Sequence, residues 1–515
     1  MTKSLLFDQA MQEWGSLLGS ERAICDPEVL IKYQNNITEF KRQIPAVLKP
    51  RNREDVIKII EIANKYQVPL YPVSQGKNWG QGSALPVTDD CVLVVLESLN
   101  QIIEVNERLR YAIIEPGVTQ KQLSDYLISI GSRLLFSMTG SGNDTSIIGN
   151  ILERGSACYG QRSQNIIAAE VLFGNGANVR TGNWQFENEG NTTHFYRHGL
   201  GPDINGLLCQ SNFGIVLSMV VSLMPLRKQK LVFMKFPQDQ IEKITDALFY
   251  LKEDQIICGG PVILNRFDHR MKKICETHQE ENSWFMATTL RGNGQLLLEL
   301  QKEFESRLQS IDSNIQYFDH SALEDPNTPQ VIKTFINLFD GIPSNFSLDS
   351  FKNYISDNQV KTAHYDIDND SHSPGMACVL PAVPFVGSSV REIIDEINSF
   401  STAYPFKIGF TFVTHNSTSF EGFFRVIFNR DSLDEITLAH EWSRLLYKIL
   451  EKKGLYPYRL NIEQMSYFTD RIDNPFWNTI ALLKSALDPN GIISPGRYCP
   501  LVGIPQLQTS RMTTA

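Results

Sequence analysis

Apolar residues along the first half of the chain form two kinds of pattern. Val68 to Val73 and Cys91 to Leu96 are continuous apolar runs, which are typical of buried strands. Residues 56–63 instead place Val, Ile and Ala at helical spacing, after a short strand-like run at 46–48. The pattern therefore predicts a strand-helix-strand unit, and the glycine-rich loop after Val73 lies at the end of a strand, where ligands of α/β sheets tend to bind.

Further α/β elements are expected up to residue 226. The pattern predicts short strands over 102–105 and 111–114, a helix over 120–130 and a long strand over 215–223. Residues 171–179 read as a β-hairpin, because Gly-Asn-Gly separates two apolar runs. This part of the chain therefore reads as one α/β region.

A second region begins near Arg227 and mixes helices with strands that must pair over long distances. The polar segment 319–370 allows no assignment. Elsewhere the pattern predicts helices over 241–250, 296–308, 389–400 and 433–453, and strands over 262–264, 284–290, 376–384, 409–413 and 423–428. Such a region is typical of an α+β domain.

Composition limits the classes of protein that the chain can represent. With 515 residues, two domains are the default expectation. The net charge of −9 argues against nucleic acid or an anionic membrane as the partner, and no apolar stretch is long enough to cross a bilayer. The eight cysteines form no C-x-x-C pair, and the N-terminus lacks a secretory apolar core. We therefore expect a cytoplasmic protein.

The loop from Pro72 to Val87 is the first candidate site. Its three glycines, Gly76, Gly80 and Gly82, let a ligand approach the backbone so that successive N–H groups converge on an anion such as phosphate. It is neither a Walker loop nor a dinucleotide fingerprint. A simple turn between two strands is the competing interpretation of the loop alone.

Other motifs follow this loop in a fixed order. They are Pro116-Gly117-Val118-Thr119, Gly140 to Asn150 with Glu153-Arg154-Gly155, Gln210 to Val216, Tyr458-Arg459, and Ser494-Pro-Gly-Arg497. Together they resemble the FAD-binding domain of the vanillyl-alcohol oxidase and p-cresol methylhydroxylase (PCMH) family of flavoproteins. The resemblance implies an α+β protein in which a PCMH-type FAD-binding domain, made of two α/β subdomains, is joined to an α+β cap domain with an antiparallel sheet.

The resemblance also implies a division of the chain. Residues 1–44 would be an N-terminal leader, 45–226 the FAD-binding domain and 227–455 the substrate or cap domain. Residues 456–515 would return to the FAD-binding domain, which is therefore expected to be discontinuous in sequence.

FAD is the cofactor that the resemblance implies. The 74–82 loop would cradle the pyrophosphate through its backbone amides, and the 140–150 segment would pass along the isoalloxazine ring. The expected cofactor-binding residues are Ser74, Gln75, Gly76, Lys77, Asn78, Gly80, Gly82, Gly140, Ser141, Asp144, Thr145, Ser146, Gly149, Asn150, Gly155, Ile215, Val216 and Arg497.

Two departures from the family pattern change the expected chemistry. Several relatives carry a flavin-linked histidine where this chain has Lys77, so non-covalent FAD is favoured, while a covalent link through His364, Tyr365 or His372 stays open. Vanillyl-alcohol oxidase has an aspartate near the reactive flavin nitrogen at the place of Ser141, and the nearest acid here is Asp144. The catalytic acid or base is therefore unassigned.

Tyr458 and Arg459 are the predicted catalytic residues. In phenol oxidases of the family such a pair stabilises a substrate phenolate, because a guanidinium and a phenolic O–H both donate to its oxygen. A para-substituted phenolate favours hydride loss from the benzylic carbon, giving a quinone methide. The expected function is therefore FAD-dependent oxidation of a para-substituted phenol or aromatic alcohol.

Alternatives and partners stay open. The chain could instead oxidise a non-phenolic hydroxy or amino compound in a biosynthetic pathway, or serve as an electron-transfer subunit with a partner cytochrome. The expected partners are a small-molecule substrate and either O₂ or an electron-acceptor protein, and the family often forms homodimers.

The histidines give no metal site. His194 and His198 have metal-ligand spacing, but the neighbouring glycines argue against a helix there, so no metal is expected. His415 is a candidate active-site base, although a structural histidine is the more common case.

Overall fold

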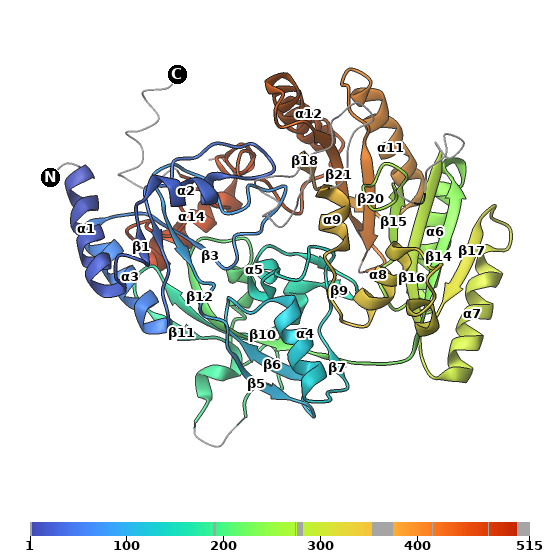
Figure 1. The fold of residues 1–515 in the computed structure, drawn as a ribbon, viewed down its shortest axis with the longest axis horizontal. Coiled ribbons are helices and arrows are strands. Elements are labelled where there is room, and N and C mark those ends of the chain that lie inside the picture. Colours follow the sequence, from blue (N-terminus) through green and yellow to red (C-terminus); the bar gives the residue numbers. More distant parts are fainter. Residues whose placement is uncertain are drawn as a thin grey trace.

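The computed structural model describes residues 3–188, 192–272, 274, 282–352, 374–414, 416–471 and 473–501. These residues form two lobes, one built from both ends of the chain and one from its middle (Figure 1). Among the described residues, the first lobe contains a four-stranded sheet, a five-stranded sheet and two two-stranded sheets, and the second lobe is one large antiparallel sheet with its helices. The fold is thus the α+β arrangement that the sequence predicted.

The first sheet of the first lobe carries the glycine loop. Helix α3 (Arg53–Tyr66) precedes its strand β3 and buries its apolar residues against α1 (Lys3–Leu18) and the sheet. Asn52 caps α3 by accepting a hydrogen bond from the N–H of Asp55. In spatial order the strands are β1 (Ala23–Ile24), β2 (Val47–Leu48), β4 (Val92–Val95) and β3 (Leu70–Val73), and the last three run parallel.

The C-terminal segment packs against this same sheet. The N–H of Leu70 donates to the carbonyl of Ile492, and the N–H of Ser494 donates to the carbonyl of Leu70, both with an N···O distance of 2.7 Å. Lys484, on α14 (Pro475–Leu487), is buried and donates to the Asp488 carboxylate at 2.5 Å. The two backbone bonds thus join residues from opposite ends of the chain, while the buried ion pair lies within the C-terminal segment.

The second sheet of the first lobe is antiparallel. Its order is β11-β10-β12-β6-β5, and the predicted hairpin is confirmed as β10 and β11. Helices α4 (Gln120–Ser129) and α5 (Ile147–Leu152) pack on it through a shared apolar core. The strands are β5 (Ile102–Asn106), β6 (Tyr111–Ile114), β10 (Ile166–Phe173), β11 (Asn178–Arg180) and β12 (Gly214–Ser222).

The second lobe has an eight-stranded sheet in the order β17-β14-β16-β15-β20-β21-β18, with β19 paired to β21. One face packs under α6 (Ile241–Glu253), α7 (Gly294–Leu308), α11 (Gly387–Ser401) and α12 (Leu433–Lys452). Helices α8 (Gln330–Phe339) and α9 (Phe346–Lys352) cover part of the other face. The strands are β14 (Gln229–Pro237), β15 (Val262–Asn265), β16 (Ser283–Arg291), β17 (Asn314–Phe318), β18 (Gly375–Val379), β19 (Ala382–Pro384), β20 (Gly409–Thr414) and β21 (Ser419–Phe428).

One predicted strand is divided in the structure. The run 376–384 forms β18 and β19, and the break lies at Leu380 and Pro381. Pro381 has no N–H to donate to a ladder, while its carbonyl accepts from the N–H of Gly422 at 2.8 Å. The single strand predicted from the sequence was therefore wrong at this point.

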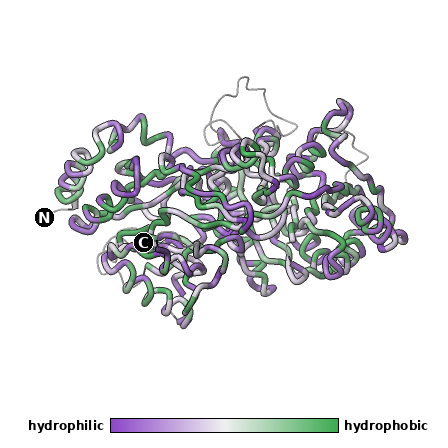
Figure 2. Tube along the Cα trace, turned by 90° about the horizontal axis from the view of Figure 1, so that it is seen from below, coloured by the Kyte–Doolittle hydropathy of each residue, from purple (hydrophilic) through white to green (hydrophobic). Residues whose placement is uncertain are grey.

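Helices in both lobes alternate hydrophilic and hydrophobic residues along the tube of Figure 2, as expected for helices with one buried face. Among the residues described, none of the helices combines the length and apolar character that a bilayer crossing requires.

Candidate functional site

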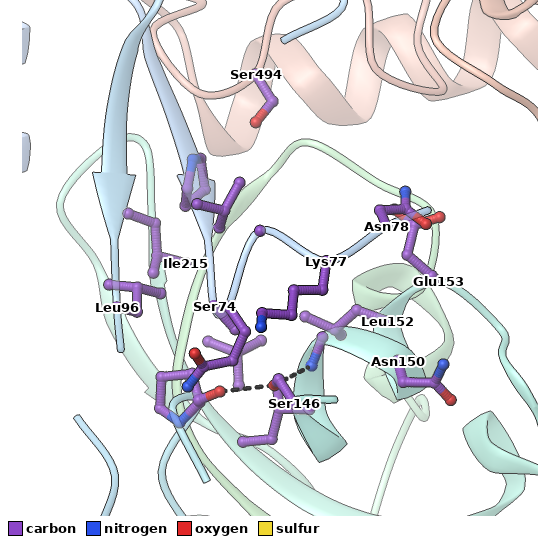
Figure 3. A pocket seen from close by; sticks show the side chains of 18 of the residues that line it. Ser74, Lys77, Asn78, Leu96, Ser146, Asn150, Leu152, Glu153, Ile215 and Ser494 are labelled. Carbon is purple, nitrogen blue, oxygen red and sulfur yellow. Dashed lines mark hydrogen bonds between the residues drawn. The ribbon is translucent and has the colours of Figure 1, made fainter. Parts of the chain in front are cut away.

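A cavity of about 160 Å³ lies where the glycine loop after β3 meets the start of α5 (Figure 3). Strand β12 and the C-terminal segment complete its wall. Of the predicted residues, Ser74, Gln75, Gly76, Lys77, Asn78, Thr145, Ser146, Gly149, Asn150, Ile215, Val216, Arg459 and Arg497 line it. Motifs that are far apart in the sequence therefore meet at one place.

The glycine loop presents unpaired backbone donors to this cavity. Gly76 has φ +65°, a left-handed conformation that glycine adopts without strain. Within the described residues, the N–H groups of Gln75, Gly76, Lys77 and Asn78 have no protein acceptor. Converging N–H groups of this kind bind anions, so the loop fits a phosphate group of a cofactor.

The opposite wall is the start of α5. The Ser146 hydroxyl donates to the Pro116 carbonyl at 2.7 Å and accepts from the N–H of Gly149 at 2.9 Å (Figure 3). A Cβ at Gly149 would lie 3.3 Å from the hydroxyl oxygens of both Ser74 and Ser146, so any other residue would press against both walls. Asn150 Oδ1 is buried against Gly155 and has no hydrogen-bond partner in the described part of the chain.

One end of the cavity carries an Arg-Glu-Arg cluster. Glu153 pairs with Arg497 and, at 3.4 Å, with Arg459, whose guanidinium also donates to Asn78. Although burial opposes it, the Glu153 carboxylate raises the pKa of Arg497. Two guanidinium groups share one carboxylate, so the cavity has an excess of positive charge that suits an anionic cofactor.

Other predicted cofactor residues lie behind the cavity wall. Gly80 and Gly82 turn toward β18 and Ile462, and a Cβ at Gly80 would lie 3.2 Å from the Cys378 sulfur. Ser141 bonds Thr145 at 2.8 Å. Asp144, with an exposed side chain, lies 3.6 Å from Lys77. Gly140 lines a separate small cavity, and Gly155 packs on Asn150. The roles of these residues stay predictions.

Tyr458 and Arg459 lie in a bend and have different surroundings. Arg459 lines the cavity, whereas the Tyr458 ring lies 6.2 Å from that of Phe423 on β21. Burial raises the pKa of Tyr458 well above its ordinary value, and the Glu421 carboxylate adds to the shift. The hydroxyl therefore stays protonated at neutral pH, and it has no partner among the described residues.

The sheet of the second lobe faces the first lobe with polar side chains. One face of β21 carries every second residue of the strand, including Glu421, Phe423 and Arg425. Glu421 accepts from Gln161 of the first lobe at 2.8 Å, which links the two lobes beside Tyr458. This face of the cap sheet is therefore in direct contact with the first lobe.

Some site residues were missed from the sequence, and some predictions cannot be located. Glu153 belonged to a noted motif, but its role between two arginines depends on residues more than 300 positions away. Arg425 gave no sequence signal. His364, Tyr365, His372 and His415 lie outside the described residues.

The spaced histidines have other partners. His194 bonds Glu187 at 3.0 Å, and His198 bonds Asp203 at 3.2 Å. Nowhere in the described ranges do three or more His, Cys, Asp or Glu residues gather as a metal site would need.

The Arg-Glu-Arg cluster predicts an effect on apoprotein stability. Glu153→Gln should lower the melting temperature of the apoprotein more than that of the FAD-loaded protein, since removing one partner of a buried ion pair costs about 3–5 kcal/mol and FAD supplies replacement negative charge. Glu39 is a matched control, because its side chain is equally buried and pairs with Arg430 at 2.5 Å. Glu39→Gln should lower both melting temperatures equally. Equal losses for Glu153→Gln would contradict this role.

The chain is similar to several known proteins. Residues 44–182 match the family described as FAD binding domain. The chain is 26% identical to 1'-carboxy-chondrochloren decarboxylase from Chondromyces crocatus, over 95% of this chain and 97% of that protein. It is 24% identical to the flavoprotein subunit of hydroxylating 4-cresol dehydrogenase from Pseudomonas putida, over 95% of each. The fold matches that of 4-ethylphenol oxidase from Gulosibacter chungangensis, solved as an isoeugenol complex, with a TM-score of 0.86 and 22% identity over 96% of this chain and 97% of that one.

The free amide donors, the glycine-lined walls and these similarities define the class of protein: the chain is a flavoprotein that binds FAD and acts as an oxidoreductase. More narrowly, it has the fold of the PCMH-type flavoproteins, with an FAD-binding domain and an antiparallel cap sheet.

Proposed function

We propose that the chain oxidises a para-substituted phenol or aromatic alcohol. The observation that carries this proposal is the Tyr458 hydroxyl, which is fully buried, protonated and without a partner in the described residues. A buried donor that lacks an acceptor is costly unless a ligand supplies one. The oxygen of a phenolic substrate is such an acceptor, and Arg459 lies next in the chain.

In this proposal each group has a separate task. The Gln75 to Asn78 amides and Lys77 hold the FAD pyrophosphate, and the wall around Ser146 supports the ring system. FAD, when bound, supplies a hydride acceptor. Tyr458 donates to the substrate oxygen, and the positive charge of Arg459 favours the phenolate over the phenol. O₂ or an electron-acceptor protein would then reoxidise the cofactor.

A second candidate is an oxidation that also removes a carboxyl group. It is favoured by the similarity to the Chondromyces crocatus decarboxylase, which extends over nearly the whole chain. Both candidates use the same FAD site, and they differ in what the cap face must bind.

The phenolate role predicts a sharp difference between two substrates. A 4-alkylphenol should reduce the bound flavin under anaerobic conditions, whereas its O-methyl ether should not, because the ether cannot form the anion that drives hydride loss. Stopped-flow absorbance of the flavin would measure both rates. Equal rates for phenol and ether would exclude the phenolate mechanism and favour a non-phenolic substrate, while a protein that no phenol reduces would have to be tested as an electron-transfer subunit.

A further inference from the structure

Arg425 lies on the face of the cap sheet that looks toward the FAD-binding lobe. Cys378 on β18 is its direct antiparallel partner, so both side chains lie on the same face. The Cys378 sulfur packs against Gly80 of the glycine loop. Arg425 is nevertheless only 7% exposed, which makes it a buried cation on the cap face that contacts the FAD-binding lobe.

The partners of Arg425 do not neutralise it. Asp268 is completely buried and accepts from Arg425 Nη2 at 2.8 Å, but it also accepts from Arg270 Nε at 2.8 Å and Nη2 at 2.7 Å. Although burial alone would raise it, Arg270 and Arg425 hold the pKa of Asp268 well below its ordinary value. One carboxylate therefore pairs with two guanidinium groups, and it binds Arg270 through two hydrogen bonds and Arg425 through one.

The remaining contacts of Arg425 are neutral. Thr411 Oγ1 accepts from Nη2 at 2.5 Å, and His269 Nδ1 lies 3.3 Å from Nη1. Burial lowers the pKa of His269 to about 3, so its ring is uncharged and its Nδ1 can accept. Arg425 Nε is buried and has no acceptor in the described ranges. A buried guanidinium with a spare donor and uncompensated charge suits an anionic ligand.

We propose that Arg425 binds the carboxylate of a 4-hydroxyphenyl substrate, and that this carboxylate leaves as CO₂ during the oxidation. The inference rests on the proposed phenol-oxidising function. The substrate would have its phenol oxygen at Tyr458 and its carboxylate at Arg425. Phe423 on β21 would lie between these two groups, since its ring packs beside Tyr458 and Arg425 is two residues further along the same face. Two residues span about 7 Å of strand, roughly the length of a substituted phenyl ring.

The chemistry places the carboxylate on the second carbon from the ring. The benzylic C–H bond breaks, its electron pair leaves as hydride to the oxidised flavin, and the phenolate becomes a quinone methide. The C–CO₂ bond then breaks, and its electron pair forms the new C=C bond while the quinone methide returns to a phenolate. For 3-(4-hydroxyphenyl)propanoate the balance is substrate anion plus oxidised flavin giving 4-vinylphenol, CO₂ and hydride-reduced flavin.

The first test compares ligands on the unmodified holoprotein. 3-(4-hydroxyphenyl)propanoate should reduce the flavin on the order of 100-fold more efficiently than its methyl ester, because the ester cannot pair with a buried guanidinium. The product should be 4-vinylphenol, identified by chromatography. Equal use of acid and ester, or a product that keeps its carboxylate, would overturn the proposal. Failure of every phenol, charged or neutral, would instead overturn the proposed function.

The second test measures binding without turnover. By calorimetry, 3-(4-methoxyphenyl)propanoate should bind the holoprotein and lose on the order of 100-fold in affinity with Arg425→Gln, while Arg425→Lys should recover part of it. Arg430→Gln is the control, since Arg430 follows the same strand but pairs with Glu39, and it should bind like the unmodified protein. Undiminished affinity in Arg425→Gln would mean that the Arg270-Asp268-Arg425 cluster is structural only.

Discussion

Gly76→Val should yield a folded but colourless protein, with FAD affinity lowered by about 100-fold or more. Valine at φ +65° is strained by about 1–3 kcal/mol, and its Cβ would lie 3.1 Å from that of Ala84. The larger effect is on the ligand, because relief of the strain and of the contact with Ala84 would displace the loop whose amides from Gln75 to Asn78 line the cavity. Each 1.4 kcal/mol lost is a tenfold loss of affinity. Titration of apoprotein with FAD, followed by flavin fluorescence, would measure it.

A control variant must show how much of the loss of FAD affinity comes from backbone strain alone. Gly131→Val provides this control. Gly131 has φ +66° and is exposed, and a Cβ placed there would meet no atom within 4 Å, so Gly131→Val carries the same strain away from the cavity. Gly131→Val should bind FAD normally. If the two variants bound FAD equally well, the glycine loop would not be the pyrophosphate site.

The fold was predictable where the apolar pattern was local. Helix α3, the β10-β11 hairpin and strand β12 follow the sequence pattern because their neighbours in space are also close in sequence or lie in one buried sheet. Helix α8 was missed because it lies in a segment dominated by Asn, Asp and Ser, although seven of its residues are buried. Strand β19 was merged with β18 because both pair with β21 in one register, and the apolar pattern does not show that the ladder is interrupted at Pro381, which has no N–H.

The site was predictable only in part, for a similar physical reason. Glycine-loop residues carry their own signal, since positive φ and close approach require glycine. Buried charges do not, because an arginine looks the same in sequence whether it pairs with a surface carboxylate or lies in a cavity. Glu153 and Arg425 acquire their roles from partners 344 and 157 residues away, which only the folded chain brings together.

Tyr458→Phe should lower kcat/KM for a 4-alkylphenol by about 10²–10³, the usual cost of removing one preorganised donor to a developing oxyanion. FAD binding and thermal stability should be unchanged, because the substitution keeps the ring beside Phe423 and removes only a buried hydroxyl that has no partner in the described chain. Steady-state oxidation and the flavin spectrum would measure the two effects separately.

Tyr447 provides the matched control for this variant. It lies on α12 in the core of the cap, and its buried hydroxyl is likewise without a partner in the part of the chain described. Tyr447→Phe therefore removes the same atom from a tyrosine in the cap core on the other side of the sheet, and its activity should match that of the unmodified protein. Equal activity of both variants would show that the Tyr458 hydroxyl does not contact the substrate, whereas equal loss in both would mean that the cap packing, and not a donor to the phenolate, limits the reaction.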